Sequence, residues 1–292
     1  MAKLNRGFNQ VALNGSVGAV TYVYRKGTTI AKQKVPPKVK AKQTPSLMAT
    51  RMRWANLVRM WQALNSVGWH PSFKSVEGLQ SDYNAFVKRN FSRGPVYLPK
   101  DVVLQGGGVV GPAQVTEGEL ASIGGSMVSG VFTSTIDMGG MDIGASTTLQ
   151  TFSQTIIEEN PDWQNGDQLT LVVLRQGGSL TAPVIVPEIH EITLNTEDTE
   201  TLLGDIVDAN YLDASNGRLA VGGTIVGGAC FVHSRETAGG TIVSTEMLAL
   251  ANTDTLNRYQ GGTAFENAVN SYGGFATSQY LTPNINQDLA AD

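Results

Sequence analysis

The stretch "LTLVVLR", residues 169–175, combines two interleaved sets of mostly apolar residues in one short segment. The first set is Leu169, Leu171 and Val173, and the second is Thr170, Val172 and Leu174. Successive residues of a strand point to opposite faces of a sheet, and here both faces carry apolar residues that require cover. The stretch therefore predicts a β-strand that is covered on both sides.

Short β-forming segments recur through the rest of the second half of the chain. Further strands are expected at Val102–Leu104, Met127–Ile136, Glu188–Leu194, Arg218–Ile225, Ala229–Ser234 and Thr241–Leu250. Hairpin turns are expected at Asn216-Gly217 and at Gly239-Gly240, and one helix near residues 147–159. Strands at this spacing with few helices predict a mainly antiparallel β-sandwich.

The N-terminal stretch "VYRKGTTIAKQKVPPKVKAKQTP", residues 23–45, holds seven of the chain's 21 basic residues and no acidic one. Alternation before and after Gly27, which can adopt a positive φ, predicts a hairpin. Pro36 and Pro37 end the sheet because they lack backbone donors. The residues that follow are expected to form an extended basic connector.

Two helices are expected after this connector. Thr44 is a helix N-cap and Pro45 occupies the first helical position. The apolar face of the first helix comprises Trp54, Leu57, Trp61 and Leu64, with a neighbouring stripe of Met48, Met52, Ala55 and Val58. A second helix is expected over residues 73–91.

The predicted fold class is α+β, in three parts. Residues 1–95 form a small basic head of a hairpin and two helices. Residues 96–258 form a sandwich-like domain with the helical insert. Residues 259–292 have no basic residue and much Gly, Asn, Gln and Tyr, which predicts an extended C-terminal arm that orders only against a partner.

Charge is divided unevenly along the chain, whose formal net charge is -4. Residues 1–100 contain 17 basic and two acidic residues, whereas residues 101–292 contain four basic and 23 acidic ones. A basic segment of this kind meets either nucleic acid, here DNA through residues 1–60, or the acidic half of a neighbouring copy. The candidate contact residues are Arg25, Lys26, Lys32, Lys34, Lys38, Lys40, Lys42, Arg51 and Arg53.

The acidic stretch from Glu188 to Asp213 carries eight carboxylates, and no Lys or Arg lies between Arg175 and Arg218. One interpretation is a solvated face that keeps the domain soluble. The other is a docking surface for the basic head of an adjacent copy. Both interpretations stay open at this stage.

The sequence motifs that resemble nucleotide-binding or metal-binding sites lack the flanking residues that such sites require. "GGGVVG", residues 106–111, matches the dinucleotide-binding pattern but is not followed by a convincing βαβ unit, so a glycine-rich turn is expected. "DASNG" lacks the bidentate Glu of a calcium loop. The single cysteine, Cys230, is expected to be buried and inert in its apolar strand, and the three histidines have no metal-ligand spacing. No catalytic, cofactor-binding or metal-binding residue is assigned.

The N-terminal half resembles an uncharacterised family, a domain of unknown function, of Bacteroidetes and their phages. The resemblance rests on "NGSVGAV" at residues 14–20, the basic hairpin, the Pro-Lys segments, the helix start from Gln43 to Arg51, and the closing hairpin "FVHSRETAGGTIVS". It covers residues 10–95 and part of 165–250. The family has no established catalytic residues.

The resemblance implies a phage or prophage setting, and therefore a virion component assembled in the cytoplasm of the bacterial host. The expected function is that of a non-enzymatic structural protein, such as an auxiliary capsid, connector or tail component. Its partners would be other copies of itself and other virion proteins. The alternative is a nucleic-acid-binding protein that uses its basic region on DNA. No membrane is expected, because no run approaches the roughly 18 apolar residues of a membrane helix.

Overall fold

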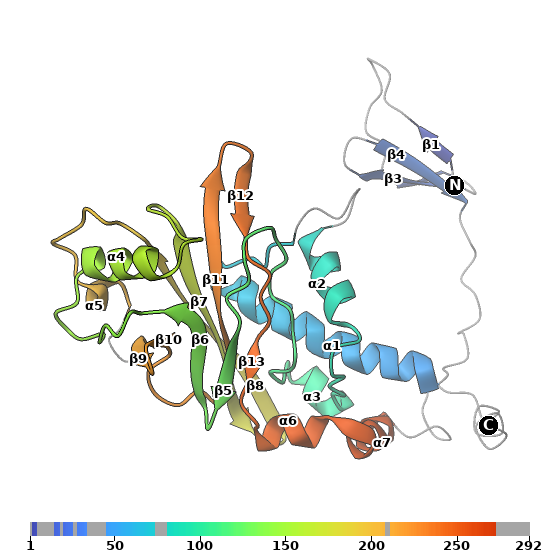
Figure 1. The fold of residues 1–292 in the computed structure, drawn as a ribbon. Helices are drawn as coiled ribbons and strands as arrows, with labels where there is room; N and C mark the ends of the chain where they lie inside the picture. Colours follow the sequence, from blue (N-terminus) through green and yellow to red (C-terminus); the bar gives the residue numbers. More distant parts are fainter. Residues whose placement is uncertain are drawn as a thin grey trace.

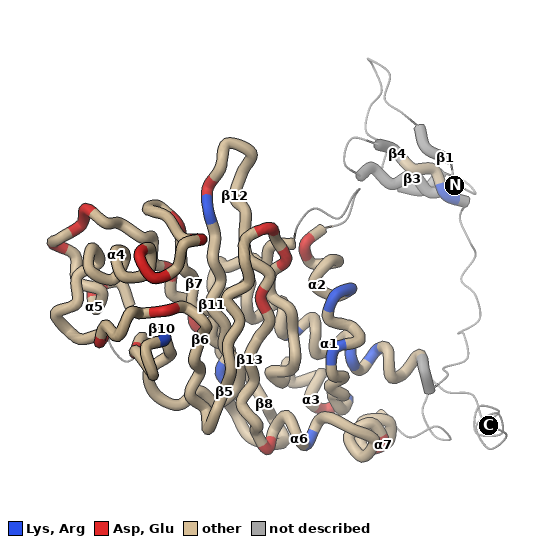
Figure 2. Tube along the Cα trace, in the orientation of Figure 1, with Lys and Arg blue, Asp and Glu red and all other residues tan. Residues whose placement is uncertain are grey.

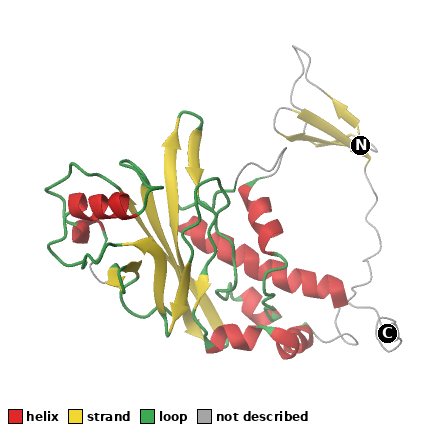
Figure 3. Ribbon diagram, in the orientation of Figure 1, coloured by secondary structure: helices red, strands yellow, loops and turns green. Residues whose placement is uncertain are grey.

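The computed structural model describes residues 2–4, 15–17, 20–25, 28–33, 45–73, 81–207 and 211–272. Helices and antiparallel strands occur together in the body formed by the later residues (Figure 1 and Figure 3), which confirms the predicted α+β class. Its centre is a five-stranded sheet of order β12-β11-β7-β8, with β13 paired to β11. The strands are β7 (Gln168–Ser179), β8 (Ala182–Thr193), β11 (Gly227–Thr237), β12 (Gly240–Val243) and β13 (Ala249–Leu250).

Strand β7 is covered on both faces, as its alternation predicts. Leu169, Leu171 and Val173 belong to one hydrophobic core, whereas Val172 and Leu174 belong to another on the opposite face. All five side chains are at most 1% exposed. The alternation in "LTLVVLR" therefore marks the middle of a three-layer body.

The first layer combines a small second sheet with two helices. The sheet has the order β5-β6-β10-β9, formed by β5 (Gly125–Val128), β6 (Val131–Asp137), β10 (Arg218–Ala220) and β9 (Asp213–Ser215). Helices α4 (Leu149–Glu159) and α5 (Leu203–Ile206) complete the layer. Phe132, Phe152 and Ile156 from this layer share a core with Phe231 of the central sheet, so the predicted sandwich packing is extended by helices.

The other layer consists of helices α1 (Pro45–Ser66) and α2 (Asp82–Asn90), which lie across the opposite face of the central sheet in Figure 1. Leu57, Met60 and Leu64 of α1 share a core with Phe86 of α2 and with Val172 of β7. The predicted boundary at residue 95 therefore does not separate two cores. The apolar face of α1 is buried against the sheet and not within an independent head.

The N-terminal strands form a separate four-stranded antiparallel sheet of order β1-β4-β3-β2. Its members are β1 (Ala2–Leu4), β2 (Gly15–Val17), β3 (Val20–Arg25) and β4 (Thr28–Gln33). Arg25 pairs with Thr28 across the β3–β4 connection, which confirms the predicted hairpin. The connector of residues 34–44 lies outside the described residues.

Several predicted elements require correction. Residues 102–104 are not a strand, because they belong to a short helix, α3 (Lys100–Leu104). This helix begins after Pro99 and ends where Gly106 adopts a φ of 79°. The described part of the second helix starts only at Asp82, since Phe73 forms a bridge with Glu117 and residues 74–80 are outside the described residues.

Three predicted strands are shorter or divided. Residues 127–136 form the β5–β6 hairpin, because Ser129 and Gly130 both have positive φ, 51° and 82°. The strand from Arg218 ends at Ala220, and Gly223 nearby has a φ of 77°. The strand expected at 241–250 is divided into β12 and β13. By contrast, Asn216 and Gly217, with φ of 53° and 71°, turn between β9 and β10 as expected.

The described part of the predicted C-terminal arm is helical and not extended. Residues 254–272 form helices α6 (Asp254–Tyr259) and α7 (Gly261–Ser271). Ala264, Ala268 and Val269 of α7 pack against Met48 and Met52 of α1, so this part is ordered within its own chain. Residues 273–292 lie outside the described residues. Within the described part of the chain, no helix has the length and apolar character needed to cross a membrane.

Candidate functional site

Eight of the nine predicted contact residues fall into three groups in the structure. Lys32 is exposed on β4, and Arg51 is exposed in α1. Arg25 belongs to β3, but its side chain is not among those described. The five lysines outside the described residues are Lys26, Lys34, Lys38, Lys40 and Lys42.

Arg53 has a role inside the body. Its Nη2 donates to the hydroxyl of Tyr97 over 3.1 Å, and its guanidinium lies 5.4 Å from the centre of the Tyr97 ring and 5.8 Å from that of Phe91. Cation–π contacts of this kind hold an arginine in place. Arg53 therefore fastens α1 to the segment after α2, and we remove it from the set of surface contact residues.

The helical layer carries most of the basic charge of the described body. Residues 45–73 and 81–100 contain seven basic residues and one acidic residue: Arg51, Arg53, Arg59, Lys88, Arg89, Arg93, Lys100 and Asp82. Figure 2 shows several blue segments close together on α1 and α2. Arg89 is engaged with Glu117 through two hydrogen bonds of 2.7 and 2.6 Å. The layer thus has a net positive charge even though part of it is used for internal contacts.

The opposite layer carries the acidic charge. We define the acidic lobe as residues 137–167, 191–207 and 213, around α4 and α5, where Figure 2 shows most of the red segments. Its exposed carboxylates are Asp142, Glu158, Glu159, Asp162, Glu191, Glu197, Glu200, Asp205 and Asp213. These ranges contain no Lys or Arg. Arg218 and Arg235, which approach from outside them, pair with Asp137 and Asp167.

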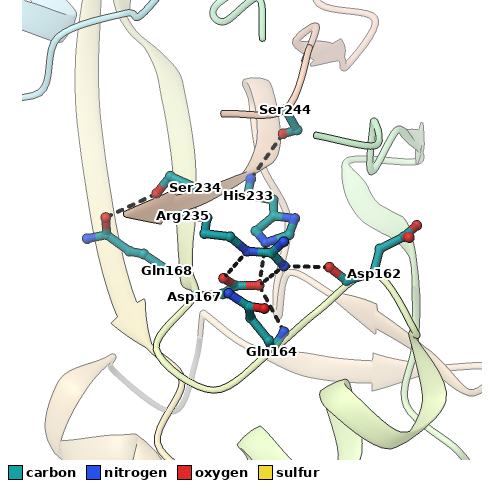
Figure 4. A network of polar contacts seen from close by, with 8 residues as sticks. All are labelled: Asp162, Gln164, Asp167, Gln168, His233, Ser234, Arg235 and Ser244. Atoms are coloured by element: carbon teal, nitrogen blue, oxygen red, sulfur yellow. Dashed lines mark hydrogen bonds and ion pairs between the residues drawn. The ribbon is translucent and has the colours of Figure 1, made fainter. Parts of the chain in front are cut away.

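Asp167 is the centre of a buried polar network below this lobe (Figure 4). Its carboxylate is 0% exposed and accepts hydrogen bonds from Nε and Nη2 of Arg235, both at 2.7 Å. The backbone N–H of Gln164 donates to it over 2.9 Å, and Nε2–H of His233 over 2.8 Å. Four donors therefore satisfy a charge that burial alone would disfavour.

His233 is equally enclosed. Its side chain is 1% exposed, and its ring stacks on Trp163 with a centroid distance of 3.8 Å and an interplanar angle of 10°. The hydroxyl of Ser244 accepts from the backbone N–H of His233, not from its ring. The network therefore places no serine hydroxyl against the imidazole, and it does not form a nucleophile–base pair.

Strand geometry explains how the network forms. His233 and Arg235 are two residues apart on β11, so both lie on one face. Leu169 pairs with His233, which brings the residues before β7 to the same end of the sheet. Arg235 also donates to the carbonyl of Asp162 over 2.7 Å. The network thereby fastens the loop of residues 162–167 to β11.

The pKa values of the network follow from burial and pairing. Burial raises the pKa of Asp167, but the donors from Arg235, Gln164 and His233 outweigh it and hold the value below normal. Burial lowers the pKa of His233, and this effect exceeds the raising effect of Asp167. The imidazole is therefore neutral in the folded protein at neutral pH.

A pH dependence of stability follows. Below the ordinary histidine pKa of about 6.5, the unfolded chain binds a proton that folded His233 binds less readily, so stability falls as pH falls. We expect the free energy of unfolding to decrease from pH 7 to pH 5, and to decrease less in His233→Gln. Urea unfolding at pH 7, 6 and 5 measures this difference. Equal slopes in both proteins would contradict the assignment.

Glu246 is a second buried carboxylate that the sequence did not reveal. It is 2% exposed and accepts hydrogen bonds from the backbone N–H groups of Ile123 and Gly124, at 2.6 and 3.1 Å. Burial nevertheless raises its pKa above normal. Cys230 is buried as expected, and burial raises its pKa well above normal. The residues that the structure describes include no group of three or more metal-ligating side chains.

The glycines of "GGGVVG" serve close packing. Gly108 donates its N–H to the carbonyl of Pro183 on β8 over 3.0 Å. A Cβ on Gly108 would lie 2.9 Å from Cβ of Arg59 and 3.0 Å from Cδ1 of Ile185. The segment passes between α1 and the edge strand, and it does not start a helix. The predicted glycine-rich turn between strands is therefore wrong. These residues form an extended segment that covers the edge strand of the central sheet.

Comparison with known proteins provides no further identification. No protein-family model, no curated protein and no solved structure matches this chain. The argument for function therefore rests on the residues and geometry described above.

Proposed function

We propose that this protein is a non-enzymatic structural protein of a phage virion, which assembles in many copies through its basic N-terminal region. The observation that carries this proposal is the division of charge across the central sheet. The basic helical layer lies on one face and the acidic lobe on the other (Figure 2). The virion setting and the assembly in the host cytoplasm come from the resemblance alone.

The division of charge determines which contacts can form. The helical layer and the lobe are separated by the buried sheet, so neither neutralises the other within one body. In two neighbouring copies, the basic region of one can face the acidic lobe of the next. Such a head-to-tail contact uses different surfaces on the two copies and produces rings or filaments. A repeating assembly is what a structural virion protein requires.

The exposed position of two predicted contact residues agrees with this arrangement. Lys32 on β4 and Arg51 on α1 are exposed, and the lobe offers nine exposed carboxylates. Complementary charges of this kind steer association and set its specificity more than they add affinity. Salt above physiological concentration screens such contacts because the Debye length falls below about 8 Å. Assembly through them is therefore salt-sensitive.

Removal of residues 1–44 is expected to weaken the salt-sensitive association strongly while the body stays folded. The hydrophobic cores of the body are formed by residues from Met48 onward, so the deletion leaves them complete. Sedimentation velocity of both proteins at 50 mM and 500 mM NaCl measures the effect. Full-length protein that is monomeric at 50 mM NaCl and high concentration would refute the proposal.

A matched pair of variants tests the acidic side. Glu158→Gln, Glu197→Gln and Glu200→Gln together remove three charges from the lobe, whereas Asp82→Asn, Asp101→Asn and Glu266→Gln remove three exposed charges elsewhere. We expect weaker association in the lobe variant only. Equal weakening in both would indicate that net charge, and not the lobe, is responsible.

A measurement of DNA binding by the full-length protein distinguishes this proposal from the alternative, in which the basic region binds DNA. If Lys32, Lys34, Lys38, Lys40 and Lys42 contact about five phosphates, log K for duplex DNA falls with log salt at a slope of about -4 to -5. Gel-shift titrations of full-length protein at two salt concentrations measure that slope. We expect negligible DNA binding at physiological salt. Tight, salt-dependent binding would make DNA the primary partner.

A further inference from the structure

A mainly apolar pocket of about 370 Å³ lies between helices α1, α3 and α7. The buried side chains of Met48 and Met52 contribute to it from α1, and Val103 and Leu104 contribute from α3. Leu104 is 76% exposed, more than any other large apolar side chain in the described part of the chain. An exposed leucine beside an apolar pocket is the kind of surface that another segment covers.

Contacts among these helices fix the position of the pocket. The backbone N–H of Lys100, the first residue of α3, donates to the hydroxyl of Ser271 at the end of α7 over 2.8 Å. Tyr272 lines the pocket, and its backbone N–H donates to the carbonyl of Val269 over 3.1 Å. In Figure 1, α3 and α7 lie beside α1. The described part of the chain therefore ends at the wall of the pocket.

The residues that follow Tyr272 match the apolar lining in chemistry. Residues 273–281 read "GGFATSQYL" and carry three large apolar or aromatic side chains, those of Phe275, Tyr280 and Leu281. Aromatic side chains bury the largest apolar areas and commonly anchor a segment in a pocket. Phe275 is the first of the three along the chain, so it is the candidate anchor.

Phe275 is close enough to enter the pocket. It is three residues after Tyr272, and an extended chain spans roughly 10 Å over three residues. Gly273 and Gly274 let the chain turn in the direction that the pocket requires, because glycine adopts both signs of φ. An apolar cavity of about 150 Å³ holds benzene. The pocket is larger than that, so it accommodates the Phe275 ring and part of a second side chain.

Charge also favours this occupant. Among the described residues that line the pocket, the charged ones are Arg51 and Lys100, both basic. Residues 273–292 contain two acidic residues, Asp288 and Asp292, and no basic one. The charge of the segment is therefore opposite to that of the pocket lining, which favours their association.

We propose that residues 273–281 occupy this pocket of their own chain, with the ring of Phe275 against Val103 and Leu104. The same chain is favoured over a second copy because a short flexible tether gives an effective concentration on the order of millimolar. The segment predicted to order only against a partner thus finds that partner in its own body. The inference does not rest on the proposed function, although Arg51 belongs to both surfaces.

The test is limited proteolysis of full-length protein by chymotrypsin, which selects aromatic residues. The buffer contains 0.5 M NaCl, which screens charged contacts between copies. Leu104→Asp places a carboxylate in the apolar wall, and Leu104 is exposed enough for the body to stay folded. Cleavage tracks the fraction of time that a segment is open, so we expect it to be about tenfold faster after Phe275 in Leu104→Asp than in the unmodified protein. Mass spectrometry of the products measures the two rates.

The matched control is Val67→Asp, because Val67 is 45% exposed and does not line the pocket. We expect cleavage after Phe275 in this control to be as slow as in the unmodified protein. Circular dichroism verifies that each variant is folded, and Leu104→Ser replaces Leu104→Asp if the latter is not. Equal rates at 1 µM and 20 µM protein are expected for a segment that binds its own chain.

Three results would overturn the proposal. The first is cleavage after Phe275 in the unmodified protein that is as fast as in the Leu104 variant, because the pocket then does not hold the segment. The second is equal acceleration in Val67→Asp, which would attribute the effect to added charge. The third is protection that appears only at the higher protein concentration, because a second copy would then supply the segment.

Discussion

Asp167→Ala is expected to lower the free energy of unfolding by about 3–5 kcal/mol, the range measured when one partner of a buried ion pair is removed. The variant leaves Nε and Nη2 of Arg235 without their carboxylate, and it removes the acceptor of His233 and of the Gln164 N–H. Because Asp167 is 0% exposed, water does not readily replace the lost partner. Urea denaturation at pH 7 measures the loss.

The matched control for this prediction is Glu117→Ala. Glu117 forms a two-bonded ion pair with Arg89 that resembles the Asp167–Arg235 pair in geometry, but the two side chains are 26% and 41% exposed. A surface pair is worth about 0–1 kcal/mol, so the control is expected to lose no more than that. Comparable losses in the two variants would contradict the claim that burial makes Asp167 important.

Leu64→Ala is expected to cost about 2–5 kcal/mol and to shift the unfolding of the whole body. Leu64 is 0% exposed and belongs to the core shared by α1, α2 and the central sheet. Truncation leaves a cavity in that shared core, so both layers lose stability together. Tryptophan fluorescence and far-ultraviolet circular dichroism during urea unfolding are expected to give one coincident transition.

The control for Leu64 is Trp54→Ala on the same helix. Trp54 is 43% exposed, although a stripe of apolar residues predicted it to be part of the buried face. We expect a smaller loss in this variant because less surface returns to water. Two separate transitions, with only one shifted by Leu64→Ala, would restore the independent head that residues 1–95 were predicted to form.

Elements with strong local signals were predicted correctly. The hairpin at Asn216-Gly217 forms because these residue types accept positive φ, and α4 forms after Thr148, whose hydroxyl accepts from the N–H of Thr151. Helix α1 begins at Pro45 as predicted. In each case the information lies within a few consecutive residues.

Elements with weak local signals were predicted wrongly. Val102 and Val103 are β-branched, but three residues are too few for periodicity to distinguish a strand from the helix α3. Gly, Asn and Tyr after residue 259 indicate disorder by composition, yet Ala264 and Ala268 of α7 find burial against α1. Their stabilisation comes from a partner more than 200 residues earlier, which composition does not reveal.

The buried network around Asp167 also could not be predicted from the sequence. His233 and Arg235 are visible as an alternating pair on a strand, and Asp167 as an acid before the strand of residues 169–175. Their meeting depends on the pairing of Leu169 with His233, a register that joins residues 64 apart. A shift of one residue would move the side chains to the other face.

The sequence by itself determined that residues 169–175 form a strand covered on both sides, that charge is opposed between the two halves, and that several turns and helices begin where they do. These are properties of local periodicity, turn chemistry and composition. Only the tertiary structure decided what covers each face of β7: α1 and α2 on one side, α4 and the small sheet on the other. The physical reason is that alternation specifies which side chains must leave water, whereas the identity of their neighbours depends on contacts between residues far apart in the chain.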